Sequence, residues 1–289
     1  MERHTHIDTL ITLIDDPDIE VYVAVKEKLL ESGPSILPVL EYALSSSKNL
    51  IQHDRLETII LTLKLEKLVD KMALWAQKEE KTLLEGWILA SSVHYPAIMA
   101  EKIELIIQKI SRDIWLELND AFTSIEKISV INHLFFDVYH FELNTTDTNL
   151  AENCLINNLL VSRKGNLISL ATLYCIIAQR LELPVHPIGI GKYLILGYYG
   201  PQISKEVYGE DASPYLFYIN MEHKGAIIGA KELEYVLHEN KENLESATPL
   251  SQGKLIKWLL RVLKQCYTLN GSEDKIGIIN KLNDVLRDY

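Results

Sequence analysis

The sequence has few of the residues that interrupt regular secondary structure or form disulfide bonds. Its 289 residues include 13 glycines, 9 prolines and 3 cysteines. Cys154, Cys175 and Cys266 are far apart, odd in number and without the C-x-x-C spacing of a zinc or redox pair, which argues against a disulfide framework and a zinc site. We therefore expect reduced thiols in a reducing compartment.

The sequence also lacks an excess of positive charge and a long apolar run. Its net charge is −11, so we expect no nucleic-acid partner. No run approaches the roughly 18 apolar residues that cross a bilayer, and the first residues, MERHTHIDTL, lack the pattern of a secretory signal. These features predict a cytoplasmic protein without a membrane span.

Helical periodicity dominates the first part of the chain. Ile7, Leu10, Ile11 and Ile14 form one helical stripe. DDPD (15–18) and SGPS (32–35) then separate two further helical patterns. This order is similar to HEAT repeats, and because so few repeats cannot form a long solenoid, we expect residues 1–75 to be a HEAT-like capping or partner-docking layer.

The remainder, residues 76–289, is predicted to be a second domain of α+β class. Helical periodicity continues through 76–150, and 142–154 is polar enough for a surface loop. Within 151–225, one long apolar helix precedes short strands at 185–190, 192–199 and 213–220. Helices return over 226–289. The expected fold is a helical layer followed by a small antiparallel sheet around a central buried helix.

A series of residues around the central helix forms a specific motif. It follows N-x-x-L-N-x-x-L-x-x-R-K-G-x-P-x-S-L-x-x-L-Y and then R-L-x-L-P-V. The matching residues are Asn153, Ile156, Asn157, Leu160, Arg163, Lys164, Gly165, Ser169, Leu170, Leu173, Tyr174, Arg180, Leu181, Leu183, Pro184 and Val185. The motif resembles the transglutaminase-like superfamily, in particular its bacterial SirB/YchA-type branch, over about residues 75–270.

This resemblance implies three active-site positions. Active members of the superfamily use a cysteine at the start of the central helix, a histidine on the next strand and an aspartate on the following strand. Those positions fall at Leu167 or within a residue of it, at Lys192 and at Asn220. None of the three side chains can supply the nucleophile, the base or the orienting carboxylate.

The sequence therefore predicts a catalytically inactive transglutaminase-like protein, without a cofactor or metal, that acts as a binding or scaffold module. Its former cleft would be lined or flanked by Arg163, Ser169, Lys192 and Asn220, with His186 as a further cleft candidate. Cys175 lies eight residues into the central helix on an apolar stripe, which predicts an unreactive core thiol.

Two alternatives from other functional classes stay open. The chain could be a hydrolase or acyltransferase with relocated residues, with Ser169 as nucleophile and His186 as base. It could instead be a helical adaptor that binds a partner protein through residues 1–75.

Overall fold

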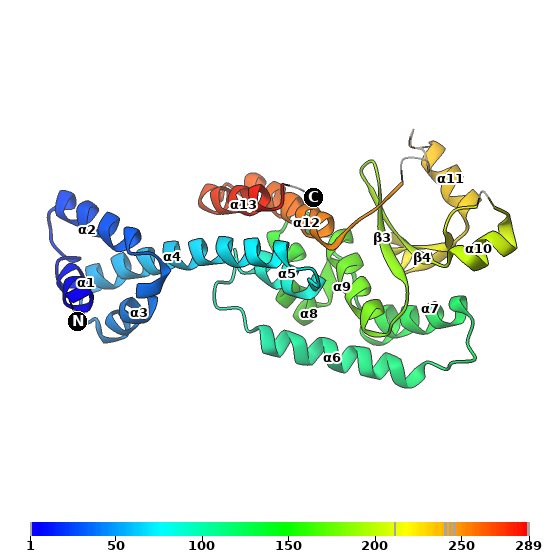
Figure 1. The fold of residues 1–289 in the computed structure, drawn as a ribbon, viewed down its shortest axis with the longest axis horizontal. Coiled ribbons are helices and arrows are strands. Elements are labelled where there is room, and N and C mark those ends of the chain that lie inside the picture. The colour runs from blue at the N-terminus through cyan, green and yellow to red at the C-terminus, as the bar shows by residue number, and fades with distance from the viewer. Residues whose placement is uncertain (1, 211, 240–241, 243, 245–246, 288–289) are drawn as a thin grey trace.

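A computed structural model describes residues 2–210, 212–239, 242, 244 and 247–287. The molecule is elongated, with the N-terminal helices at one end and the sheet at the other (Figure 1). Within the described residues, no helix has the length and apolar character needed to cross a membrane.

Four helices and a short 3₁₀ turn form the N-terminal end of the molecule. They are α1 (Glu2–Thr12), α2 (Ile19–Glu31), η1 (Pro34–Ile36), α3 (Leu37–Ser46) and α4 (Leu50–Gln77). Asp18 caps α2 by accepting from the Glu20 N–H at 2.8 Å. The predicted stripe is buried in a separate core that extends from Ile7 to Leu63.

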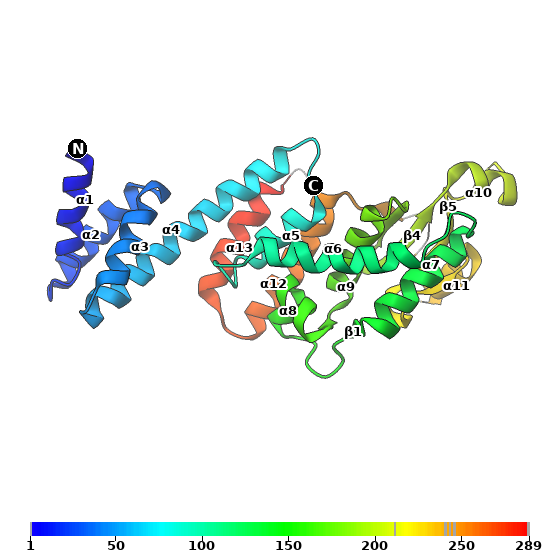
Figure 2. The ribbon, with the colours of Figure 1, turned by 90° about the horizontal axis from the view of Figure 1, so that it is seen from below.

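Helix α4 connects this core to a larger one. Its residues up to Leu63 pack in the N-terminal core, whereas Leu68, Met72 and Trp75 belong to the main core. Figure 2 shows α4 running from the N-terminal helices to the side of α13 (Glu273–Val285). The helix is continuous up to Gln77, and the division of the chain after residue 75 stays a prediction.

The main core surrounds helix α9 (Leu167–Arg180). Every residue from Ile168 to Ala178 is buried, which confirms the predicted central helix. Several helices and one π-helical turn lie around it. They are α5 (Leu83–Ser91), α6 (Ala100–Glu117), α7 (Ser124–Asn132), η2 (His133–Val138), α8 (Ile156–Ser162) and α12 (Gln252–Leu269).

An antiparallel sheet with strand order β6-β5-β4-β3-β7 packs beside α9. The strands are β3 (Val185–Ile190), β4 (Tyr193–Tyr199), β5 (Tyr215–Asn220), β6 (Ala226–Ile228) and β7 (Thr248–Pro249). Val185, Leu196 and Ile219 pack in the main core with α9. Ile188 and Tyr218 pack in a third core on the other face, against α11 (Ala230–Glu239).

The three predicted strands are confirmed, with small differences at their ends, and the α+β class is correct. The sequence did not predict α10 (Pro201–Tyr208), β6 or β7. The prediction of a surface loop over 142–154 was wrong in part. Strand β1 (Glu142–Leu143) pairs with β2 (Lys164–Gly165), and η3 (Ala151–Cys154) buries Cys154.

Helices α4 and α5 cross closely because Gly86 lacks a side chain. A Cβ on Gly86 would lie 2.5 Å from Cζ2 of Trp75, a fully buried ring. We expect Gly86→Ala to lower the free energy of unfolding by about 1–3 kcal/mol through overpacking. Urea unfolding measures the change.

Gly277→Ala is the matched control, because Gly277 is an exposed position of helix α13 and a Cβ there meets nothing within 4 Å. It should stabilise the protein by about 0.5–1 kcal/mol. Equal effects of the two substitutions would contradict a packing role for Gly86.

Candidate functional site

The candidate site is built from the first turn of α9, where the resemblance noted in the sequence predicts a nucleophile position. Asn166 is the N-cap, and its Oδ1 accepts from the Ser169 N–H at 2.9 Å. The Ser169 hydroxyl donates back to the Asn166 carbonyl at 2.9 Å. Asn166 also donates its own N–H to the Asn153 carbonyl at 3.2 Å. The polar groups of this turn are thus largely satisfied within the protein.

Leu167 is the first residue of α9 and packs, half-buried, against the main core. The amide groups of a first helical turn favour negative charge. A leucine side chain carries neither a nucleophilic atom nor a negative charge that these amide groups could stabilise. This position supplies apolar packing.

Lys192 and Asn220 lie on two other elements. Lys192 is exposed in the turn between β3 and β4, with its Nζ 5.3 Å from the centroid of the Tyr193 ring. Asn220 ends β5 and caps the turn η4 (Met221–His223), where its Oδ1 accepts from the Glu222 N–H at 3.0 Å. Because strand side chains alternate, Asn220 lies on the same face as Tyr218, opposite α9.

Among the described residues, no hydrogen bond or ring contact joins any two of Leu167, Lys192 and Asn220. The structure does bring Arg163, Leu167 and Ser169 into one short segment before and within the first turn of α9. The assignment of the three positions to a former triad stays a prediction.

Ser169 and His186 also lie in different environments. Ser169 is fully buried, and its hydroxyl is occupied by the Asn166 carbonyl. His186, on β3, packs against aromatic rings, 5.1 Å from the Tyr199 centroid and 6.2 Å from that of Tyr215. Burial lowers the pKa of His186. A neutral, ring-packed imidazole results.

Arg163 has an unusual position between α8 and β2. It adopts a left-handed backbone with φ 65°, and its guanidinium carbon lies 4.9 Å from the Phe141 ring centroid and 5.7 Å from that of Tyr139. Its Nη1 is buried without a hydrogen-bond partner. Burial lowers the pKa of Arg163, and Tyr139 opposes that shift.

Cys175 is fully buried in the middle of α9, as predicted. Burial raises the pKa of its thiol to about 12. The thiolate that would act as a nucleophile is therefore scarce at neutral pH.

A polar cluster that the sequence did not reveal lies between α5, α12 and α13. Nδ1 of His94 lies 2.8 Å from the Tyr267 hydroxyl and 3.4 Å from Nζ of Lys275. Burial and then Lys275 lower the pKa of His94, whereas Glu152 raises it. Because His94 and Lys275 are 181 residues apart in the sequence, no local motif could have indicated this cluster.

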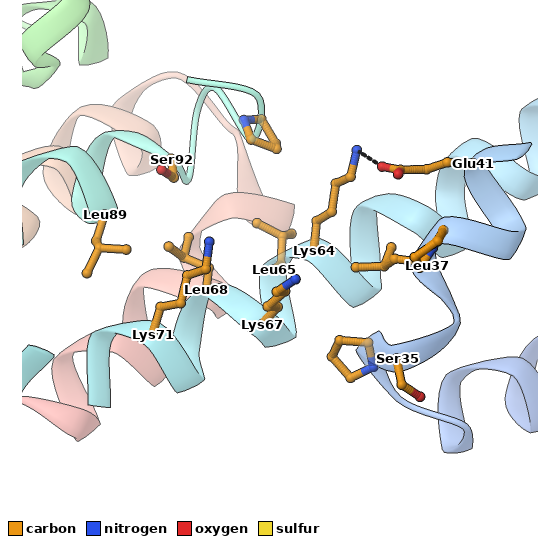
Figure 3. A pocket seen from close by; sticks show the side chains of 13 residues that line it. Ser35, Leu37, Glu41, Lys64, Leu65, Lys67, Leu68, Lys71, Leu89 and Ser92 are labelled. Carbon is orange, nitrogen blue, oxygen red and sulfur yellow. Dashed lines mark ion pairs between the residues drawn. The ribbon is translucent and has the colours of Figure 1, made fainter. Parts of the chain in front are cut away.

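A cavity of about 410 Å³ lies where η1 and α3 meet α4 and α5, and Figure 3 shows the side chains that line it. Lys64 and Glu41 are among the lining residues and form an ion pair 2.7 Å long (Figure 3). Across the described part of the chain, no three His, Cys, Asp or Glu side chains are grouped closely enough to hold a metal ion.

The cap of α9 can be tested directly. Asn166→Ala removes the acceptor for the Ser169 N–H, and we expect the free energy of unfolding to fall by about 0.5–2 kcal/mol. Asn166→Asp keeps an acceptor and places negative charge at the helix start, so it should retain most of the stability in urea unfolding. An alanine variant within about 0.3 kcal/mol of the wild type would contradict this role for the cap.

Comparison with known proteins agrees with this architecture. A family model described as transglutaminase-like superfamily matches residues 101–263, which include α9 and most of the sheet. The UPF0162 protein PM0557 of Pasteurella multocida (strain Pm70) is 29% identical over 80 residues, 28% of this chain and 30% of that protein. The match thus spans less than a third of that relative. No solved structure matches the chain. The family model matches more than half of the residues of this chain, and the chain therefore belongs to the transglutaminase-like superfamily.

Proposed function

We propose that the chain is a non-catalytic member of its superfamily that acts as a binding or scaffold module. The observation that carries the proposal is Leu167 in the first turn of α9, where catalysis requires a nucleophile. Lys192 and Asn220 at the other two positions lack the chemistry of a base and of its orienting carboxylate.

The surroundings of α9 weigh against a relocated nucleophile. The Ser169 hydroxyl is buried and donates to a backbone carbonyl. On β3, His186 is two residues from Ile188, so the two side chains lie on the same face of the sheet. This face is the one opposite α9. A nucleophile needs a base within hydrogen-bond reach, and these contacts offer none to Ser169.

Arg163 supports the binding part of the proposal. Its guanidinium is partly exposed and stacks on Phe141, and among the described residues it forms no ion pair with a carboxylate. A guanidinium with unused donors binds carboxylate or phosphate oxygens well. The segment before α9 would therefore contact an acidic group of a partner protein.

Two finer assignments accompany this proposal. The residues Arg163, Lys164 and Gly165, which precede α9, support membership of the SirB-type branch. The separate N-terminal core and the helical order α1 to α3 support a HEAT-like layer.

A second candidate function is a helical adaptor that binds a partner through this layer. Ile19, Tyr42 and Leu50 are 62%, 75% and 76% exposed on it, and their burial against a partner would remove apolar surface from water. If Ile19→Ser and Leu50→Ser abolish partner binding in the full chain while Arg163→Ala does not, the adaptor function is supported over the first proposal.

Covalent probes test the absence of catalysis. We expect a fluorophosphonate to leave Ser169 unmodified and a maleimide to leave Cys175 unmodified at neutral pH, because both side chains are buried and the pKa of Cys175 is raised to about 12. After unfolding in guanidinium, the maleimide should react with Cys175. Intact and peptide mass spectrometry locates each adduct.

Two variants complete this experiment. Leu167→Cys is the positive control, because a thiol at a helix N-terminus has a lowered pKa, and it should be labelled much faster than Cys175. Ser162→Ala removes an exposed serine close in sequence and is the matched control for Ser169→Ala. A fluorophosphonate adduct that Ser169→Ala removes and Ser162→Ala leaves would overturn the proposal.

A further inference from the structure

Another cavity, of about 630 Å³, lies between α4, the segment that follows α5, and α13. Helices α4 and α13 pack against each other (Figure 2). The apolar part of the cavity wall includes Leu61 and Leu65 of α4 and Ile278 of α13. Its volume suits a small molecule, since ligand sites commonly enclose about 300–1,000 Å³.

The polar cluster of His94, Tyr267 and Lys275 adjoins this cavity, because His94 and Lys275 are two of the residues that line it. Nδ1 of His94 lies 2.8 Å from the buried Tyr267 hydroxyl and 3.4 Å from Nζ of Lys275. An ammonium group can only donate, so Nδ1 accepts and the imidazole carries its proton on Nε2. The pKa of His94, which burial and Lys275 lower, agrees with a neutral ring.

The groups that line this side of the cavity keep donors that no protein acceptor occupies. Among the described residues, Nε2 of His94 forms no hydrogen bond, and no ion pair joins Lys275 or Lys281 to a carboxylate. Lys275 is half-buried and Lys281 is exposed, and both line the cavity from α13. One imidazole N–H and two ammonium groups can therefore donate to a molecule bound there.

The cavity is positively charged although the protein as a whole is strongly negative. The net charge of the chain is −11, yet the described lining residues include two lysines and a single acid, Glu66. Lysine ammonium groups bind phosphate as point charges. The attraction is stronger at a half-buried position such as that of Lys275 than in bulk water, because the surroundings screen it less.

We propose that this cavity binds a small phosphate monoester with an apolar body. The phosphate oxygens would accept from Lys275, Lys281 and Nε2 of His94, and the apolar body would pack on Leu61 and Leu65. A phosphate monoester carries about 1.5 to 2 negative charges at pH 7, which suits two ammonium groups in the presence of one glutamate better than a singly charged carboxylate does.

This site is separate from the segment around α9. All the residues that line it lie outside residues 101–263, which match the family model. The inference therefore does not depend on the proposed function. A ligand held between α4 and α13 would also stabilise the contact of these two helices, because binding to the folded state alone raises its stability.

Isothermal titration calorimetry of the full chain with phenyl phosphate, in a buffer without phosphate, tests the proposal. We expect one saturable site and a higher midpoint of thermal unfolding with the ligand present. Benzoate has a single charge and inorganic phosphate has no apolar body, so each should bind at least about tenfold more weakly than phenyl phosphate.

Two variants remove the cationic donors while they keep the length of the side chain. Lys275→Met and Lys281→Met should each weaken phenyl phosphate binding by about tenfold, as expected for the loss of one charge-assisted hydrogen bond. Circular dichroism checks that each variant folds. If Lys275→Met prevents folding, Lys281→Met gives the same test, because Lys281 is exposed.

Lys67→Met is the matched control. Lys67 is another exposed lysine, and it lines the separate cavity of Figure 3. Its replacement should leave phenyl phosphate binding unchanged, since Lys67 does not line the cavity beside α13.

Three results would overturn the proposal. They are the absence of saturable phenyl phosphate binding at millimolar concentration, benzoate binding as tight as that of phenyl phosphate, and loss of binding in Lys67→Met while the variants at Lys275 and Lys281 bind as the wild type does.

Discussion

The enclosure of helix α9 is the constraint on which the rest of the structure depends. Eleven consecutive residues, Ile168 to Ala178, are buried, between the sheet on one side and helices α5, α6 and α12 on others. Burial of each large aliphatic side chain contributes about 1.5–3 kcal/mol. A helix covered in this way cannot leave its terminal amides to water, so the protein itself must supply their partners.

Asn166 meets that requirement at the start of α9. It accepts from the Ser169 N–H, and its own donors reach Asn153 and Cys154. The same network holds the 142–154 segment in place, where Nδ2 of Asn153 donates to the Asp147 carbonyl. The first turn of α9 is thus tied into the core.

Local periodicity predicted most of the fold. The stripe at Ile7 to Ile14, the apolar run of α9 and the strand at 185–190 have the spacings of their elements. The short strands β6 and β7 were missed because two or three residues carry too little pattern. Segment 142–154 was misjudged because Asn153 hydrogen-bonds to Asn144 and to the Asp147 carbonyl within the segment, and the polar composition does not reveal such internal bonds.

By itself, the sequence determined the class of fold, the central helix and the side chains present at Leu167, Lys192 and Asn220. Only the tertiary structure decided which polar side chains meet. Cys175 lies within the visible motif yet is enclosed in the apolar core, whereas Nδ1 of His94 lies 2.8 Å from the Tyr267 hydroxyl. The physical reason is that the His94 contact joins residues far apart in the chain, and packing of α12 against α5 brings them together.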